Sequence, residues 1–164
     1  MDVLSLVALL AVCAPMVHAN TGQALMGTES ALNPYAIGVV GHRLERQPRT
    51  RTEALATARS LQVHGHNFSV GLAQINVHNF KRLGLTTETA FEPCSNLSAM
   101  QTILTDCYAR AAKRTQLPQP ALRKALSCYY SGNFVTGFAH GYVRRVIEAA
   151  SAPPTTLHPT KESS

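Results

Sequence analysis

The sequence predicts a mainly α-helical domain of the α+β class with a small hairpin region. Three patterns support this class. Thr50-Arg51-Thr52-Glu53 is a capping box that opens a helix reaching about Val63. Apolar residues recur at helical spacing through residues 98–114 and give that segment one apolar face. Residues Tyr35–Gln47 alternate loosely around two glycines, a pattern that favours a short hairpin.

The remaining elements are predicted from caps and helix-breaking residues. Thr21 is the expected N-cap of a helix over Gly22–Ala31, which Asn33-Pro34 ends. A glycine-containing turn is expected over 67–76, before a short helix from Val77. Residues 91–94 are predicted as a loop, 117–120 as a break and 131–133 as a turn, with helices over 121–130 and 142–150. Residues 1–150 are thus predicted to form one domain, and 151–164, rich in Pro, Thr and Ser, a mobile tail.

Composition narrows the class of partner. A chain of 164 residues with 45% hydrophobic residues has enough apolar side chains for one core and is not a disordered sequence. Lys plus Arg is 15 and Asp plus Glu is 9, so the formal net charge of +6 favours an anionic partner. Basic residues do not alternate with aromatic ones in any block, so nucleic acid is not the expected partner. A polymer that carries carboxylates fits better, and peripheral contact with a membrane surface is compatible with this charge.

The apolar N-terminal run has two interpretations. Residues Val3–Val12, followed by Val17-His18-Ala19, have the pattern of a signal peptide and its cleavage site. However, the segment begins with Asp2 and carries no Lys or Arg, and cleavage after Ala19 would leave an odd number of cysteines. The run is also too short for a transmembrane span. We therefore expect a buried first helix that ends near Cys13-Ala14-Pro15.

Four cysteines, an even number, are typical of two disulfides in an oxidising compartment, with buried free thiols as the alternative: Cys13, Cys94, Cys107 and Cys128. Neither a CxxC pair nor a Cys/His zinc spacing is present, so no metal or other cofactor is expected. Three pairings are possible. Cys107–Cys128 is favoured because each lies about ten residues from the loop that joins two antiparallel helices.

Glu29 is the first candidate for chemistry. It lies near the end of the predicted helix over 22–31, between the apolar residues Met26 and Leu32. An apolar environment would raise its pKa, as a general acid requires. From position alone, an ordinary solvated helix glutamate is the alternative.

The sequence around Glu29 resembles the first of four motifs of the Slt-type lytic transglycosylases, which have a lysozyme-like fold. The motifs E-S-x-x-N-P, G-L-M-Q-I, A-Y-N-A-G and Tyr-Val are matched, in order, by residues 29–34, 71–76, 128–132 and 142–143. Ala73 and Tyr130 stand where the family usually has Met and Asn. All four motifs in order make the resemblance specific.

Within this family, the chain is more similar to the VirB1-like branch of type IV secretion systems, across about residues 10–150. The supporting segments are residues 33–40, 53–60, 67–72, 91–94 and 125–133. Residues 13–18 also fit and lie inside the domain in that branch, which supports a retained N-terminus. The resemblance implies that the protein acts in the periplasm and that type IV secretion components are its partners.

The resemblance also implies a reaction. Protonated Glu29 would donate to the bridging oxygen of the MurNAc–GlcNAc bond of peptidoglycan and would then, as a carboxylate, accept the proton of the MurNAc C6 hydroxyl. The product is a 1,6-anhydro sugar, and no water is consumed. Ser30, Gln74, Tyr129 and Tyr142 are the implied substrate-binding residues. Gln74 would position sugar or peptide groups, Tyr129 would orient the carboxyl group of Glu29, and Tyr142 would line the cleft.

Two other functions remain open from the sequence. A hydrolytic, lysozyme-like muramidase would need a second carboxylate opposite the first, and Glu45 could supply it. A non-catalytic wall-binding scaffold would keep the cleft without turnover. The intact set of Glu29, Gln74 and Tyr129 argues against the scaffold.

Overall fold

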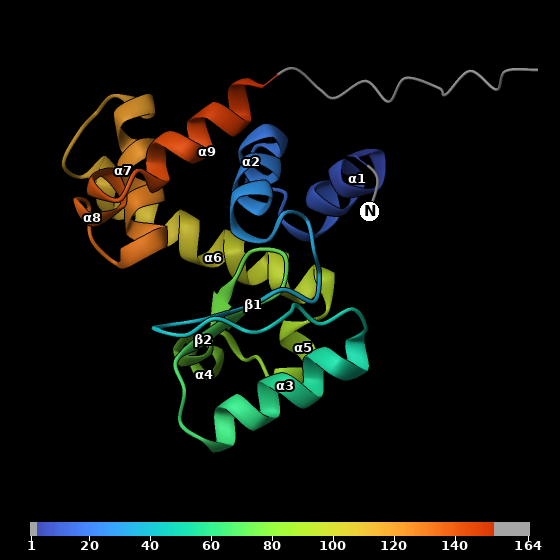
Figure 1. Ribbon diagram of the computed structural model, residues 1–164. Helices are drawn as coiled ribbons and strands as arrows, with labels where there is room; N and C mark the ends of the chain where they lie inside the picture. The colour runs from blue at the N-terminus through green and yellow to red at the C-terminus, as the bar shows by residue number, and fades with distance from the viewer. Residues whose placement is uncertain (1–2, 153–164) are drawn as a thin grey trace, which may run out of the picture.

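The structure, a computed structural model, describes residues 3–152 as two lobes joined by the long helix α6, Pro93–Ala112 (Figure 1). One lobe is helical and contains α1 (Val3–Cys13), α2 (Ala19–Ser30), α7 (Pro118–Ser131), α8 (Thr136–Ala139) and α9 (Tyr142–Ser151). The other holds a three-stranded antiparallel sheet and the helix α3, Arg51–Val63. The predicted mainly α, α+β class is therefore confirmed.

The N-terminal segment is a helix that packs into the helical lobe. Leu6 and Leu10 are fully buried, and α1 lies against both α2 and α6. A disulfide joins Cys13 at its end to Cys94 in the first turn of α6. The expected first helix, which ends at Cys13, is confirmed, but only one face is buried, since Val12 is 78% exposed. Among the described residues, 3–152, every helix falls short of the length and apolar character that a membrane span requires.

Helix α2, which carries Glu29, begins earlier in the chain than predicted. Its N-cap is His18, whose Nδ1 accepts a hydrogen bond from the Asn20 amide, so the assignment of Thr21 as the cap was wrong. Gly22 faces α1 closely, because a Cβ at this position would lie 2.7 Å from a methyl carbon of Leu10. The Asn20 side chain donates to the carbonyl oxygen of Ala150 at 3.0 Å and ties α2 to α9.

The sheet forms between distant segments and not within Tyr35–Gln47. Strand β1 (Ile37–Val39) pairs with β2 (Phe68–Val70), which in turn pairs with β3 (Ile75–Asn76). Within the predicted hairpin segment, the structure retains a tight turn with a single antiparallel bridge between Val39 and His42, while the longer pairing of β1 is with β2. The side chain of Gln47 replaces a strand partner, because its Oε1 accepts from the Ile37 amide at 2.8 Å and its Nε2 donates to the Ile37 carbonyl at 2.9 Å.

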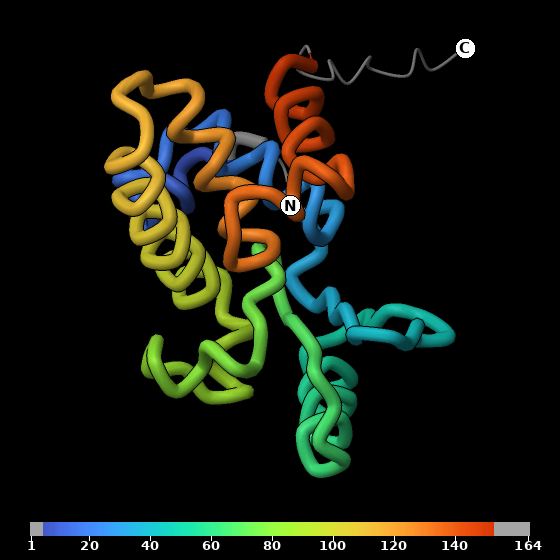
Figure 2. The backbone as a smooth tube through the Cα atoms, turned by 90° about the vertical axis from the view of Figure 1, so that its left-hand side faces the viewer, coloured from blue at the N-terminus to red at the C-terminus, as the bar shows by residue number. Residues whose placement is uncertain are grey.

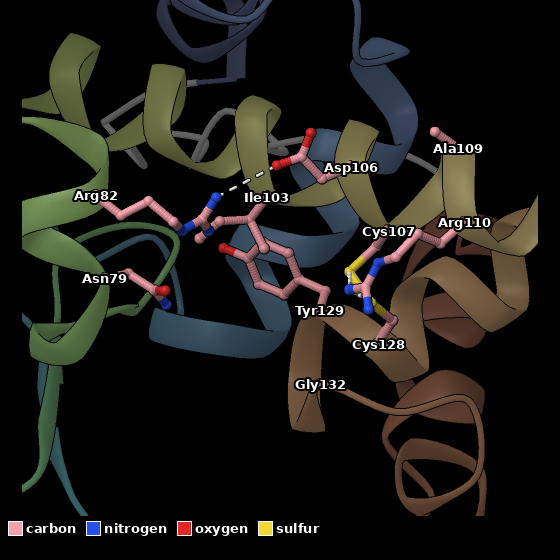
Figure 3. Close-up of a pocket in the computed structure, with 10 residues that line it drawn as sticks. All are labelled: Asn79, Arg82, Ile103, Asp106, Cys107, Ala109, Arg110, Cys128, Tyr129 and Gly132. Carbon is pink, nitrogen blue, oxygen red and sulfur yellow. Dashed lines mark hydrogen bonds and ion pairs between the residues drawn. A yellow bond between two sulfur atoms is a disulfide. The ribbon is translucent and has the colours of Figure 1, made fainter.

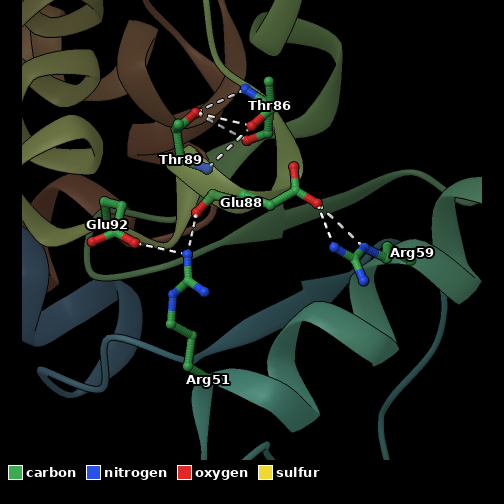
Figure 4. A network of polar contacts seen from close by, with 6 residues as sticks. All are labelled: Arg51, Arg59, Thr86, Glu88, Thr89 and Glu92. Atoms are coloured by element: carbon green, nitrogen blue, oxygen red, sulfur yellow. Dashed lines mark hydrogen bonds and ion pairs between the residues drawn. The ribbon is translucent and has the colours of Figure 1, made fainter.

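Helix α3 has Thr50 as its N-cap, as predicted, and ion pairs link it to the segment before α6 (Figure 4). Arg59 pairs with Glu88 at 2.6 Å and Arg51 with Glu92 at 2.7 Å. All four side chains are exposed enough that each pair adds little stability. The short elements between the sheet and α6 are η1 (Val77–Asn79), α4 (Phe80–Leu83) and α5 (Thr87–Ala90).

Prolines begin the two later helices instead of ending them. Pro93 and Pro118 occupy the first helical turn of α6 and α7, where a missing amide hydrogen costs nothing. Both helices therefore start earlier than predicted, and the expected loop at 91–94 and break at 117–120 are shorter. Helix α7 ends at Gly132, whose φ of 78° suits glycine. Helix α9 confirms the last predicted helix and includes Ser151, which was predicted to begin the tail. The rest of the predicted tail lies outside the described residues from position 153 onward.

Candidate functional site

Glu29 lies in the last turn of α2, partly buried between the two lobes. Burial raises its pKa from 4.5 to about 7, while a hydrogen bond from Tyr142 and the positive charge of Arg145 act in the opposite direction. The desolvation effect is the largest. Near neutral pH this carboxyl group is therefore present in both protonated and ionised forms, which is the property that a proton-shuttling group requires.

The chain turns sharply directly after Glu29. Ala31 and Leu32 have φ values of 50° and 63°, in the left-handed region that residues with a side chain rarely adopt. The hydroxyl of Ser30 donates to the carbonyl oxygen of Met26 at 3.1 Å and to that of Leu72 at 2.8 Å. Ser30 thus fastens the end of α2 to the loop after β2. The structure gives this residue a positioning contact, and its place among the substrate-binding groups stays a prediction.

The loop from Gly71 to Gln74 is the second strained segment. Gln74 has a φ of 49° and is, with Ala31 and Leu32, one of three non-glycine residues with positive φ in the described chain, 3–152. Asn96, buried on α6, fixes this loop: its Oδ1 accepts from the Ala73 amide at 2.8 Å and its Nδ2 donates to the Val70 carbonyl. A Cβ on Gly71 would collide with the Asn96 amide. All three strained residues therefore belong to the predicted motifs, where backbone strain is typical of functional sites.

Two backbone hydrogen bonds fix the orientation of the Gln74 side-chain amide at the cavity. Its Nε2 donates to the carbonyl oxygens of Ala36 and Gly71, both at 3.0 Å. These two bonds use both amide hydrogens, so Oε1 is the group left to accept a hydrogen bond from a sugar. Gln74 lines the same cavity as Glu29, as the sequence predicted.

The two motif tyrosines exchange the roles that the resemblance implied. The hydroxyl of Tyr142 donates to Oε1 of Glu29 at 2.6 Å, whereas the hydroxyl of Tyr129 donates to the carbonyl oxygen of Ala73 at 2.7 Å. Tyr142 therefore orients the carboxyl group, and Tyr129 lines the cleft. The ring of Tyr130 stacks on that of Tyr142 with centroids 4.5 Å apart, and its hydroxyl lies 3.1 Å from Nδ1 of His140.

These residues surround a cavity of about 480 Å³ between the lobes. The segments that contribute, the end of α2, the strand region 68–76 and the end of α7, approach one another in the second view of the backbone (Figure 2). The lining residues are Glu29, Gly38, Val39, Val40, Ser69, Gln74, Asn76, Asn79, Ile103, Tyr129, Tyr130, Ser131 and Gly132. Ser69, Asn76 and Asn79 also line the cavity but were not predicted as site residues. Asn76 lies in the matched motif over 71–76, whereas Asn79 is a single polar residue that gives no pattern.

Among the described residues, 3–152, Glu29 is the one acid that lines this cavity. Glu45, the alternative second carboxylate, lines a different hollow with Arg46, Pro48 and Glu53. In the described part of the chain, residues 3–152, His, Cys, Asp and Glu side chains form no group that could hold a metal ion. The cysteines pair as Cys13–Cys94 and Cys107–Cys128, which confirms the favoured pairing.

The comparisons with known proteins agree with this geometry. The family described as Transglycosylase SLT domain matches residues 9–150. The chain is 50% identical over 150 residues to the type IV secretion system protein virB1 of Brucella abortus, an alignment that covers 88% of this chain and 62% of the relative. It is 40% identical to protein virB1 of Rhizobium radiobacter, across 92% of this chain and 63% of that one. No solved structure gives a significant match.

The chain spans about three fifths of the length of these relatives, since the alignments cover 62% and 63% of them. Within the chain itself, the match to the family extends from the second half of α1 to the end of α9. It therefore includes Glu29, the strained loops and both tyrosines that contact them. This chain belongs to the Transglycosylase SLT domain family.

Proposed function

We propose that this chain is a peptidoglycan lytic transglycosylase that cleaves the MurNAc–GlcNAc β-1,4 bond. The observation that carries the proposal is Glu29, which is the one acid that lines the cavity in the part of the chain that the structure describes and which has a pKa of about 7. A single residue that first donates and then accepts a proton works best when its pKa lies near the working pH. A two-carboxylate hydrolase has less support, because Glu45 lines another hollow.

The proposed reaction returns Glu29 to its starting state. The protonated carboxyl group donates to the glycosidic oxygen as the bond from that oxygen to the MurNAc anomeric carbon breaks. The resulting carboxylate is stabilised by the hydrogen bond from Tyr142 and by the charge of Arg145. It then takes the proton from the C6 hydroxyl, whose oxygen bonds to the anomeric carbon and closes the 1,6-anhydro ring. The acid that was consumed in the first step is restored in the second.

The similarity to virB1 proteins supports a place in type IV secretion. In this proposal the enzyme opens the wall locally where secretion machinery assembles, and its site of action is the periplasm. The two disulfides fit an oxidising compartment. The cavity is lined by polar and aromatic side chains of the kind that bind glycan strands.

Mass spectrometry of digested murein sacculi tests the reaction. We expect the purified chain to release 1,6-anhydro-muropeptides, and Glu29→Gln to reduce their yield by about 100-fold or more, because the amide cannot shuttle a proton. Glu45→Gln is the matched control and should keep the wild-type yield. Products with reducing-end MurNAc would favour hydrolysis, and bound but uncleaved sacculi would favour the scaffold.

A further inference from the structure

A second cavity, of about 590 Å³, opens between α4, α6 and α7 directly beside the Glu29 cavity (Figure 3). Both cavities are lined by Asn79, Ile103, Tyr129 and Gly132, so they adjoin each other. A polymer bound at Glu29 therefore has room to extend, or to place a substituent, beyond Tyr129. Nothing in the proposed reaction uses this space.

The charged groups of the second cavity are two arginines and one aspartate. Arg82 is paired with Asp106 at 3.3 Å, which leaves Arg110 as the uncompensated charge. Within residues 3–152 Arg110 takes part in no ion pair; its Nη2 donates to the disulfide sulfurs of Cys128 at 2.8 Å and Cys107 at 3.5 Å. Sulfur is a weak acceptor, so the guanidinium keeps its charge and most of its five N–H donors for a stronger one.

The exposed side chain of Arg110 lies against a rigid part of the cavity wall. The Cys107–Cys128 disulfide fixes α6 to α7, and the guanidinium rests on it at the cavity wall (Figure 3). The planar fork of N–H donors in a guanidinium matches the two oxygens of a carboxylate. Asn79, at the junction of the two cavities, makes no side-chain hydrogen bond within the described residues and can add a donor.

We propose that the second cavity binds a carboxylate carried by the glycan strand, with Arg110 as its anion-binding group. This inference rests on the proposed function, because the strand must enter from the Glu29 cavity. Two sources share this chemistry: the lactyl carboxylate of a MurNAc without peptide, and the carboxylates of the stem peptide. The site gives the enzyme a preference for carboxylate-bearing strands over uncharged glycans.

Binding measurements in a Glu29→Gln background test this, since that variant holds substrate without cleaving it. Three probes of equal glycan length are titrated: fragments bearing stem peptides, fragments stripped of peptide by an amidase, and uncharged GlcNAc oligomers. Arg110→Gln should weaken binding of a carboxylate-bearing probe by about tenfold or more. It should leave the affinity for GlcNAc oligomers unchanged. A loss of affinity for the peptide-bearing probe would identify a stem-peptide carboxylate, and a loss for the stripped probe would identify the lactyl carboxylate. Arg123→Gln, the same change on α7 outside both cavities, is the matched control.

Equal affinity of Arg110→Gln and its parent for all three probes would overturn the proposal, and so would an equal loss for the uncharged oligomers. Arg110→Lys keeps the positive charge but cannot donate two parallel hydrogen bonds to a carboxylate. If the arginine contact is bidentate, the affinity of Arg110→Lys should lie between those of Arg110→Gln and its parent. Failure of this inference is distinct from failure of the proposed function. If the inference fails, Arg110→Gln and its parent show no probe-specific difference in affinity. If the proposed function fails, the wild-type chain releases no anhydro products.

Discussion

The hydroxyl of Tyr142 donates a 2.6 Å hydrogen bond to Oε1 of Glu29, across 113 residues of sequence. The contact joins the first turn of α9 to the last turn of α2. Burial raises the pKa of Glu29 to about 7, and this hydrogen bond opposes the rise because it favours the ionised form. Tyr142 therefore adjusts the acidity of the catalytic candidate while remaining outside the residues that line the cavity.

Tyr142→Phe keeps the ring and removes this hydrogen bond. The pKa of Glu29 should then rise above its wild-type value of about 7. The alkaline limb of kcat/KM against pH, where Glu29 loses the proton that it must donate, should move upward by on the order of one pH unit. Tyr130→Phe is the matched control, because its hydroxyl contacts His140 and not Glu29. An alkaline limb that stays in place in Tyr142→Phe would contradict this account.

Glu29 should also make stability depend on pH. Its pKa rises from 4.5, the ordinary value for a solvated glutamate in an unfolded chain, to about 7 in the folded protein. Its contribution to stability is therefore fully present below about pH 4.5 and is lost as the pH rises through 7. The loss is at most about 3 kcal/mol. Glu29→Gln cannot ionise, so its free energy of unfolding should exceed that of the wild type at about pH 8 and converge toward it at about pH 4.

Urea unfolding curves at the two pH values measure this difference. Glu53 and Glu88, whose pKa values arginine contacts lower to about 2, have the opposite dependence. They are present in both proteins, so their effect cancels in the comparison. A stability difference that does not change with pH would show that Glu29 has an ordinary pKa.

The sequence located Glu29 and Gln74 because each lies in a short motif with a local signal. The partner of Glu29 could not be found in that way. Tyr129 and Tyr142 lie on different helices, and only the packing of α7 and α9 against the rest of the domain decides which hydroxyl reaches the carboxyl group. The sequence pattern therefore identified both tyrosines and assigned their roles in the wrong order.

Two other differences have the same origin in long-range contacts. The side chain of Gln47 bonds to the backbone of Ile37, so the hairpin segment keeps only the Val39–His42 bridge and pairs mainly with β2. Asn96 is a polar residue just before the predicted helix over 98–114, yet it is 1% exposed and bonded to the backbone of Val70, Ala73 and Ala90. A buried amide that fixes a strained loop leaves no periodic signal in a single sequence.

Gly38→Ala should damage substrate binding without unfolding the protein. Gly38 lies on β1 at the cavity, and a Cβ there would approach Oε1 of Gln74 to 2.7 Å. The end of a flexible side chain can move, so the fold should tolerate the methyl group, but the acceptor that faces the cavity would be displaced. We expect KM for glycan to rise by about tenfold, the value of one hydrogen bond to substrate, with little change in kcat. Gly27→Ala is the control, since a Cβ there meets no atom within 4 Å; equal kinetics for both variants would contradict the role of Gln74.

The two disulfides should differ both in stability and in their effect on activity. Cys13–Cys94 closes a loop of 81 residues and Cys107–Cys128 one of 21. Chain entropy therefore predicts that removal of the first costs about 4 kcal/mol and removal of the second about 3 kcal/mol. The Cys13→Ser/Cys94→Ser and Cys107→Ser/Cys128→Ser double variants, unfolded in urea beside the wild type, measure these costs.

Activity should follow the opposite order when both variants are folded. Cys13 and Cys94 line neither of the two adjoining cavities, whereas Cys107 and Cys128 form the wall on which Arg110 rests, next to Tyr129. The Cys107→Ser/Cys128→Ser variant should therefore lose affinity for glycan, and the Cys13→Ser/Cys94→Ser variant should keep it at temperatures below its unfolding transition. Muropeptide release and glycan binding, measured at one such temperature, decide the matter. Equal activity of the two variants would show that the second bridge acts on stability alone.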